Sequence, residues 1–221
     1  MDIKELLGTE SAALIEDGMV VGLGTGTTAT AFIESLSERC RGGLRITAVA
    51  TSEATADLAR SLGITLVSIE DVDNIDIVVD GADEVDDNKR IIKGGGGALL
   101  REKIVATMSK RVVIIVEEDK RVENLGAFGL PVEIVPFGYK ATIEKLVSLG
   151  YSAELRNDNG EAFVTDGGNY IVDITLDEPL RSPEDDNIKI ISVVGVIETG
   201  FFFGIADAIL VGYHDGHTEI I

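Results

Sequence analysis

The sequence predicts an α/β fold, in which a doubly wound, mostly parallel sheet carries an inserted small α+β domain. Through the first half of the chain, short continuous apolar runs alternate with segments of helical spacing. This alternation is typical of buried parallel strands with helices on both faces. From about Gly126 the rhythm changes to a meander of strand-like segments joined by polar turns. Apolar runs return at the end of the chain, where we expect them to rejoin the first sheet.

The elements of the first half are expected to start with a helix and then to alternate. The predicted helices cover 3–16, 28–40, 51–62 and 98–109, and the predicted strands cover 19–23, 46–50, 64–69, 75–79 and 112–116. Thr51 and Ser52 offer hydroxyls that can cap the third helix, and Gly63 can end it.

The second half is expected to form the small domain. Its predicted strands cover 132–135, 151–156, 161–164 and 170–174, and its first helix covers 140–149. Ser182 followed by Pro183 is a typical helix start. Strands at 208–211 and 217–221 are expected to return to the first sheet. The predicted domains are therefore 1–126 with 199–221, and 127–198.

Composition excludes several classes of protein. The 221 residues include 45% hydrophobic side chains, enough for a substantial core, and their formal net charge is −20. Such a charge disfavours nucleic acid and anionic membrane surfaces as partners. No apolar run reaches the roughly 18–20 residues of a membrane span. Cys40 is the single cysteine, which excludes an intrachain disulfide and fits a reducing cytoplasm.

A glycine- and threonine-rich turn follows the first predicted strand. Gly24, Thr25, Gly26, Thr27 and Thr28 separate that strand from a helix. Such a turn presents N–H groups at the positive end of a helix, and the hydroxyls add donors, so it favours a bound phosphate. The alternative is a turn that binds nothing. The spacing differs from both the dinucleotide fingerprint and the P-loop.

Acidic residues follow the strand that ends near Val79. Asp80 and Asp83 lie three residues apart on a turn that Gly81 permits. In doubly wound sheets ligands bind at this carboxyl edge, so the two acids can accept hydrogen bonds from sugar hydroxyls or hold a metal. A solvated acidic turn is the competing interpretation.

Four consecutive glycines at 94–97 are the strongest signal in the chain. Lys93 precedes them, and Glu102 lies about one turn into the helix that follows. Because glycine is entropically costly to order, this run predicts that something approaches its backbone closely. The competing interpretation of Glu102 is a surface residue that pairs with a lysine on the same helix. Lys120, after the 112–116 strand, is either a ligand or an ordinary surface lysine.

Two histidines near the C-terminus raise the question of a metal. His214 and His217 flank Asp215-Gly216, which is a strong hairpin signal between the last two predicted strands. We interpret them as hairpin residues and expect no metal. The chain also has no Cys–His zinc spacing.

In combination these segments resemble the A-type ribose-5-phosphate isomerases. The resemblance is carried by GLGTGTTA at 22–29, DGADEVD at 80–86, KGGGGALLREK at 93–103, Asp119-Lys120 and LPVEIVPF at 130–137. It implies a Rossmann-like domain with an inserted ferredoxin-like one, and a homodimer or homotetramer. It also implies interconversion of D-ribose 5-phosphate and D-ribulose 5-phosphate in the cytoplasm, within the non-oxidative pentose phosphate pathway, without a cofactor.

The resemblance also implies roles for individual residues. Glu102 corresponds to the catalytic base, Asp80 and Asp83 to the acids that contact the sugar, and Lys93 and Lys120 to the family's lysines. The remaining substrate-binding residues that it implies are Thr25, Gly26, Thr27, Thr28, Gly81, Ala82, Gly94, Gly95 and Gly96.

Other functions fit the same fold. A sugar-phosphate-binding sensor domain is the main alternative, although binding alone would not need Glu102. A nicotinamide-dependent dehydrogenase would need the third fingerprint glycine, which Thr27 replaces. A phosphosugar deaminase or lactonase, or an acyl-CoA transferase, is disfavoured by the pairing of DGADE with KGGGG.

Overall fold

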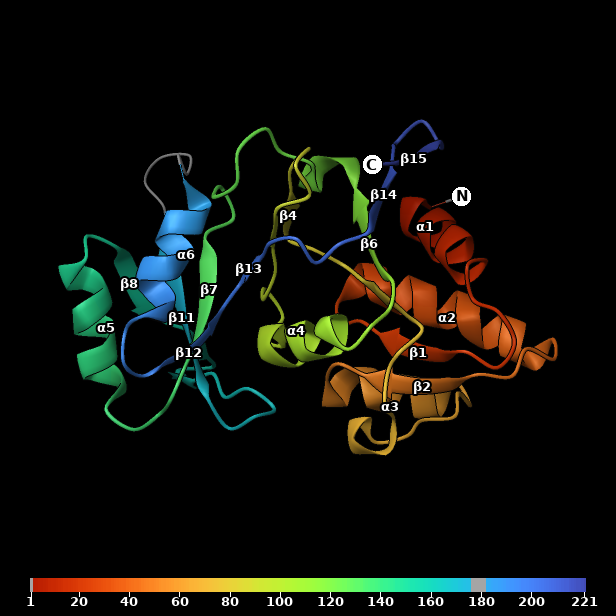
Figure 1. The fold of residues 1–221 in the computed structure, drawn as a ribbon, viewed down its shortest axis with the longest axis horizontal. Coiled ribbons are helices and arrows are strands. Elements are labelled where there is room, and N and C mark those ends of the chain that lie inside the picture. Colours follow the sequence, from red (N-terminus) through yellow and green to blue (C-terminus); the bar gives the residue numbers. More distant parts are fainter. Residues whose placement is uncertain (1, 176–181) are drawn as a thin grey trace. The chain divides into compact units, whose positions relative to one another are not determined.

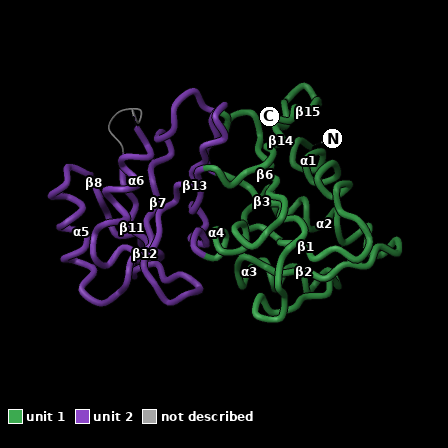
Figure 2. The backbone as a smooth tube through the Cα atoms, in the orientation of Figure 1, with its two compact units in different colours: residues 1–82, 101–121, 204–221 green, residues 83–100, 122–203 purple. Residues whose placement is uncertain are grey.

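The structure is a computed structural model that describes residues 2–175 and 182–221. The chain forms two compact units, coloured green and purple in Figure 2. Unit 1 comprises Met1–Ala82, Arg101–Arg121 and Gly204–Ile221, and unit 2 comprises Asp83–Leu100 and Val122–Phe203. None of the helices in the described residues has the length and apolar character that a membrane crossing requires.

Unit 1 is built on a six-stranded sheet with the order β15-β14-β6-β3-β1-β2 (Figure 1). Five strands of this sheet, β1, β2, β3, β6 and β14, pair in parallel, and its sixth strand, β15, is antiparallel to β14. The doubly wound, mostly parallel sheet is therefore confirmed. Its strands are β1 (Val20–Leu23), β2 (Thr47–Ala50), β3 (Ile77–Asp80), β6 (Val112–Glu117), β14 (Ala208–Gly212) and β15 (Thr218–Ile220).

One predicted strand of this sheet is reduced to a single bridge. The 64–69 segment pairs with β2 only through Leu66, in parallel with Ala48. The chain then enters a 3-10 turn, η1 (Ile69–Asp71), whose start the Ser68 hydroxyl caps by accepting from the Glu70 N–H. When that bridge is counted as a strand, the order from it to β14 is the 3-2-1-4-5-6 of Rossmann folds, and β15 adds a seventh strand beside β14.

Four helices belong wholly or largely to unit 1: α1 (Ile3–Ala12), α2 (Thr27–Arg41), α3 (Glu53–Ser61) and α4 (Leu99–Thr107). The predicted cap of α3 is confirmed, because the Ser52 hydroxyl accepts from the Thr55 N–H at 3.1 Å. Leu7 of α1 and Phe32 of α2 are fully buried in one apolar core with strand residues of the sheet.

Unit 2 contains a four-stranded antiparallel sheet with the order β12-β7-β11-β8. Along the chain the elements follow as β-α-β-β-α-β, which is the ferredoxin-like arrangement. A small hairpin, β9 (Asn157–Asp158) with β10 (Glu161–Ala162), lies outside that sheet. The main elements are β7 (Leu130–Ile134), α5 (Tyr139–Ser148), β8 (Ser152–Leu155), β11 (Tyr170–Thr175), α6 (Pro183–Ile191) and β12 (Val196–Thr199).

A second small sheet in unit 2 joins segments far apart in the sequence. β5 (Ile91–Ile92) pairs with both β4 (Glu84–Val85) and β13 (Phe201–Phe202), and all three pairs of residues are buried. Residues 83–100 therefore group with unit 2, whereas the sequence pattern predicted them in the first domain. The cause is this pairing with β13, which has no local sequence signal.

Candidate active site

The glycine- and threonine-rich turn of unit 1 lies where the sheet changes direction. β1 and β3 are neighbours, and the chain leaves β1 for β2 on the opposite side, so their carboxyl ends flank the topological switch point. Ligands of doubly wound folds bind at this point. Asp80 ends β3, is 3% exposed, and its Oδ1 accepts from the N–H groups of Thr25 (3.0 Å) and Gly81 (2.8 Å). A buried carboxylate thus holds both turns together.

Gly24 is required by this arrangement. A Cβ at this position would lie 2.1 Å from Asp80 Oδ1 and 2.6 Å from its Cα. We expect Gly24→Ala to lower the free energy of unfolding by about 1–3 kcal/mol, because the turn must move away from β3. Urea unfolding measures the change. Gly167→Ala is the control, since its Cβ meets only side-chain atoms, at 3.3 Å or more. Equal unfolding free energies for the two variants would contradict the close packing at Gly24.

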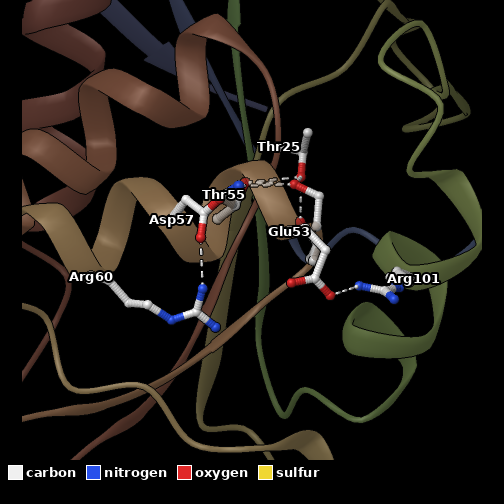
Figure 3. Close-up of polar contacts among 8 residues, drawn as sticks. Thr25, Glu53, Thr55, Asp57, Arg60 and Arg101 are labelled. Atoms are coloured by element: carbon white, nitrogen blue, oxygen red, sulfur yellow. Dashed lines mark hydrogen bonds and ion pairs between the residues drawn. The ribbon is translucent and has the colours of Figure 1, made fainter. Parts of the chain in front are cut away.

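The Thr25 side chain faces the start of α3. Its Oγ1 lies 2.7 Å from Thr51 Oγ1, 2.9 Å from Ser52 Oγ and 3.1 Å from Thr55 Oγ1. Figure 3 shows this contact between Thr25 and Thr55, with Glu53 of the same turn bonded to Arg101 at 2.9 Å. That bond lowers the pKa of the Glu53 carboxyl. The hydroxyl of Thr25 therefore orders the turn, while Thr27 and Gly26 are exposed and Thr28 is half-buried.

Lys4 is a cation at the turn that no sequence motif predicted. Its Nζ donates to Thr27 Oγ1 at 3.1 Å and lies 3.5 Å from Glu117 Oε1. It comes from the first turn of α1, 23 residues before Thr27, and nothing in its local sequence separates it from a surface lysine. The turn therefore has a nearby positive charge in a strongly acidic protein.

Glu102 is not the surface residue of the alternative interpretation, because its side chain is buried at 5% exposure. It lies in the first turn of α4, and Val105 packs one turn later against β1, 2.9 Å from where a Cβ of Gly22 would lie. Since α4 leads into the parallel strand β6, its first turn lies towards the carboxyl edge of the sheet. Three residues of helix place Glu102 about 4.5 Å nearer that edge than Val105.

Asp83 and Lys93 belong to unit 2, where the tetraglycine segment joins them. The Gly95 N–H donates to Asp83 Oδ2 at 2.8 Å. Lys93 is 3% exposed, its backbone N–H donates to the Gly200 oxygen at 2.9 Å, and its Nζ lies 5.7 Å from the Phe202 ring centroid. Pairing with β13 thus fixes Lys93.

Side chains of the protein itself lie close to the backbone of the glycine segment 94–97. A Cβ at Gly94 would lie 2.8 Å from Leu99, one at Gly95 would lie 2.7 Å from Asp83, and one at Gly97 would lie 2.3 Å from Phe163. Gly94 and Gly97 also have positive φ angles. Three of the four glycines therefore have a structural reason within the protein itself.

The acids that follow Asp83 hold loops. The buried Glu84 carboxylate accepts from the N–H groups of Gly126 and Phe128, each at 2.6 Å. Asp86 accepts from Arg90, from its backbone at 2.9 Å and its Nε at 2.6 Å. Among the acids of the DGADEVD motif, only Asp80 and Asp83 remain candidates for contact with a sugar.

Lys120 and the histidines follow β6 and β14, whose carboxyl ends lie at the same edge of the unit 1 sheet as those of β1 and β3. Lys120 ends the 3-10 turn η2 (Glu118–Lys120) after β6 and is half-buried. The predicted hairpin is confirmed by the β14–β15 pairing. His214 Nε2 lies 3.8 Å from Glu118, and His217 stacks on Tyr213 and contacts Asp215. Within residues 2–175 and 182–221, no group of three or more His, Cys, Asp or Glu is arranged to hold a metal.

The fold and these residues define a class of protein: a doubly wound α/β protein with a glycine- and threonine-rich turn at its switch point and a buried acid on an adjoining helix. Comparison with known proteins gives the family. The sequence model of the family described as ribose 5-phosphate isomerase A (phosphoriboisomerase A) matches residues 47–216. The chain belongs to this family, which confirms the resemblance inferred from the motifs.

The chain aligns with relatives over nearly the full length of both sequences. A ribose-5-phosphate isomerase A of Bacillus thuringiensis subsp. konkukian is 49% identical over 100% of both chains. One from Protochlamydia amoebophila is 42% identical, over 99% of this chain and 94% of the relative. Among solved structures, a ribose 5-phosphate isomerase from Plasmodium falciparum has a TM-score of 0.95 at 37% identity, covering 99% of this chain and 97% of its own. A D-ribose-5-phosphate isomerase in complex with phospho-erythronic acid has a TM-score of 0.94 at 39% identity, covering 100% of this chain and 97% of its own.

Proposed function

We propose that the protein interconverts D-ribose 5-phosphate and D-ribulose 5-phosphate through an enediolate, as an aldose–ketose isomerase of the non-oxidative pentose phosphate pathway. The observation that carries this function is similarity over the whole chain to isomerases of one substrate, at up to 49% identity. The complex of one similar isomerase with phospho-erythronic acid, a phosphorylated sugar acid, supports the same substrate class. The buried Glu102 supports an enzyme rather than a sensor, because binding alone needs no buried base.

The proposed reaction moves one proton between neighbouring carbons. The Glu102 carboxylate takes the hydrogen from C2 as a proton, and the C1 carbonyl oxygen receives the electron pair through the enediolate. The same carboxyl then returns the proton to C1, and the hydroxyl proton of O2 passes to O1, so that C2 becomes the ketone and C1 the alcohol. Lys93 balances the negative charge on the enediolate oxygen, an effect that is large for a preorganised buried cation.

The other proposed residues open the sugar ring and hold the phosphate. Asp83 transfers a proton between O1 and O5 when the ring opens, and Asp80 orients the sugar hydroxyls. The turn at Thr25–Thr28 receives the phosphate with the help of Lys4 and Lys120. Gly81, Ala82, Gly94, Gly95 and Gly96 are the remaining residues proposed to contact the substrate.

Incubation of the purified protein with ribose 5-phosphate, followed by detection of the ketose, tests the proposed function. We expect turnover without added cofactor. Binding of ribose 5-phosphate in calorimetry without any ketose would contradict the isomerase and favour the sugar-phosphate sensor. Binding of NAD with no binding of the phosphosugar would instead favour a dehydrogenase.

Lys4 is expected to contribute mainly to substrate binding. A hydrogen bond to a charged group is worth about 1.5–3 kcal/mol, so we expect Lys4→Met to raise KM by about tenfold or more with a small change in kcat. Steady-state kinetics measure this split. Lys145→Met is the control, since Lys145 is exposed on α5 in unit 2. An unchanged KM in Lys4→Met would remove Lys4 from the phosphate site.

Metal chelation is expected to leave the activity unchanged. The proposed electrophile is the Lys93 ammonium, and the proposed base is a carboxylate, so no step requires a Lewis acid. The rate of ketose formation before and after dialysis against EDTA measures this. A loss that added Mg²⁺ or Zn²⁺ restores would contradict the scheme and make His214 and His217 candidate ligands.

We also infer that the protein assembles as a homodimer or homotetramer in the cytoplasm. Phe137 and Val194, both in unit 2, are 94% and 92% exposed, which is unusual for large apolar side chains. Light scattering across a range of concentrations measures the assembly, and a mass of one chain throughout would contradict it. A phosphosugar substrate and the single free Cys40 fit a reducing compartment.

A further inference from the structure

Arg156 of unit 2 holds the tetraglycine segment from the side of the ferredoxin-like sheet. It lies just after β8, and its side chain is 16% exposed. Its Nη1 donates to the carbonyl oxygens of Gly94 at 2.9 Å and Gly95 at 3.1 Å. Its Nε donates to Asp173 Oδ2 at 2.8 Å and its Nη2 to Asp173 Oδ1 at 2.5 Å. Asp173 is in the central strand β11, so the guanidinium is fixed to a rigid element.

The bonds to glycine carbonyls set the direction of a neighbouring N–H group. The Gly94 carbonyl and the Gly95 N–H belong to one peptide unit, and no described peptide bond is cis. In a trans peptide the C=O and N–H point in opposite directions. Arg156 binds the oxygen of this peptide, and Asp83 Oδ2 accepts from its N–H at 2.8 Å.

The Gly94–Gly95 peptide is therefore held between a cation and an anion. Charge at both ends polarises the peptide and strengthens each hydrogen bond, and charge-assisted bonds are stronger than neutral ones. This matters most for a segment of glycines, because these residues have the widest backbone freedom and no side chains to order them. If Arg156 is removed, the glycine segment 94–97 loses the charged contact that orients the Gly95 N–H towards Asp83.

We propose that Arg156 is a positioning residue for the isomerisation: its guanidinium orients the Gly94–Gly95 peptide, and this peptide orients the carboxylate of Asp83. The proposal rests on the proposed function, in which Asp83 transfers the proton of ring opening. Asp173 serves the same purpose by holding the guanidinium. An Arg is needed because its planar fork reaches a carboxylate and two carbonyls together, whereas a Lys ammonium is a point charge without that geometry.

The test combines kinetics with a probe of the peptide itself. The variants are Arg156→Met, Arg156→Lys and Asp173→Asn, and Arg45→Met is the control, since Arg45 pairs with Asp17 on the exposed surface of unit 1. The amide resonance of Gly95 is followed by NMR in protein labelled with ¹⁵N-glycine, and Asp83→Asn supplies the reference for a weakened bond. Melting temperatures show that each variant is folded. Should Arg156→Met fail to fold, Asp173→Asn carries the same test.

Arg156→Met is expected to lower kcat by about 10- to 100-fold with KM changed far less, because small displacements of reacting groups cost this much. The Gly95 amide proton is expected to move upfield, towards its position in Asp83→Asn. For Arg156→Lys, we expect a kcat and a Gly95 resonance between those of the wild type and Arg156→Met. The Arg45→Met control is expected to match the wild type in both. A wild-type kcat, or a Gly95 resonance that does not move, would each overturn the proposal.

Failure of the proposed function would look different. In that case the wild-type protein would form no ketose from ribose 5-phosphate, whatever the state of residue 156. The Gly95 resonance reports the contact between the peptide and Asp83 without any turnover. A moved resonance together with an inactive wild type would therefore reject the isomerase and the kinetic role of Arg156 alike.

Discussion

Glu102→Gln is expected to lower turnover of ribose 5-phosphate by at least about 100-fold, the lower limit for loss of a general base. Gln keeps the size of Glu and one acceptor oxygen, but its amide cannot accept the C2 proton. Because Glu102 is buried in the first turn of α4, an isosteric change should leave the packing of that helix against β1 intact. Stopped assays of ketose formation measure kcat, and calorimetry measures binding of the substrate.

The matched control for this change is Glu38→Gln. Glu38 is exposed on α2, so the same chemical substitution is made away from the site. We expect wild-type kcat in the control, and wild-type melting temperatures and near-normal substrate binding in both variants. Turnover by Glu102→Gln within a few-fold of the wild type would remove the proposed mechanism.

Lys93→Met is expected to produce the second large loss, about 10²–10³-fold in kcat, which is typical when one preorganised stabiliser of an oxyanion is removed. Met approximates the length of the lysine stem and suits a side chain that is 3% exposed. The β5–β13 pairing that fixes the Lys93 backbone does not depend on the ammonium, so the fold should persist.

The measurement for Lys93 is kcat with substrate above KM, together with the melting temperature. Lys145→Met controls for the loss of a lysine charge in the same unit, because Lys145 is exposed. A Lys93→Met variant with wild-type kcat would show that another group balances the enediolate charge. A loss explained by unfolding would appear as a lowered melting temperature.

Much of the fold was predictable because its signals are local. Continuous apolar strands and helical spacing identified the parallel sheet, and Ser52 marked the start of α3 through its hydroxyl. The errors occurred where pairing is set at long range. Leu66 makes one bridge rather than a strand, and β5 pairs with β13 about 110 residues away, which no local pattern encodes. The last strand of the small domain, β12, was missed because it lies in a glycine-interrupted apolar run.

The candidate site was predictable where motifs are contiguous in the sequence. The turn at Thr25 and the acid at Asp80 follow neighbouring strands, and the structure joins them by a hydrogen bond. Lys4 and Arg156 were missed because each reaches the motifs only through tertiary packing, from α1 and from the region after β8. A single lysine or arginine on a helix or strand carries no sign of its partner. The glycine run stands out in the sequence, but the side chains that three of its members meet are not placed by sequence alone.

The central claim is that the Glu102 carboxyl moves the proton between C1 and C2 of the sugar. The most direct measurement is a crystal structure of this protein with a phosphorylated sugar acid bound. The account predicts a Glu102 oxygen about 3–3.5 Å from the ligand atoms that correspond to C1 and C2, the separation of reacting groups. A ligand bound in full occupancy with the Glu102 carboxyl directed away from those carbons would contradict it.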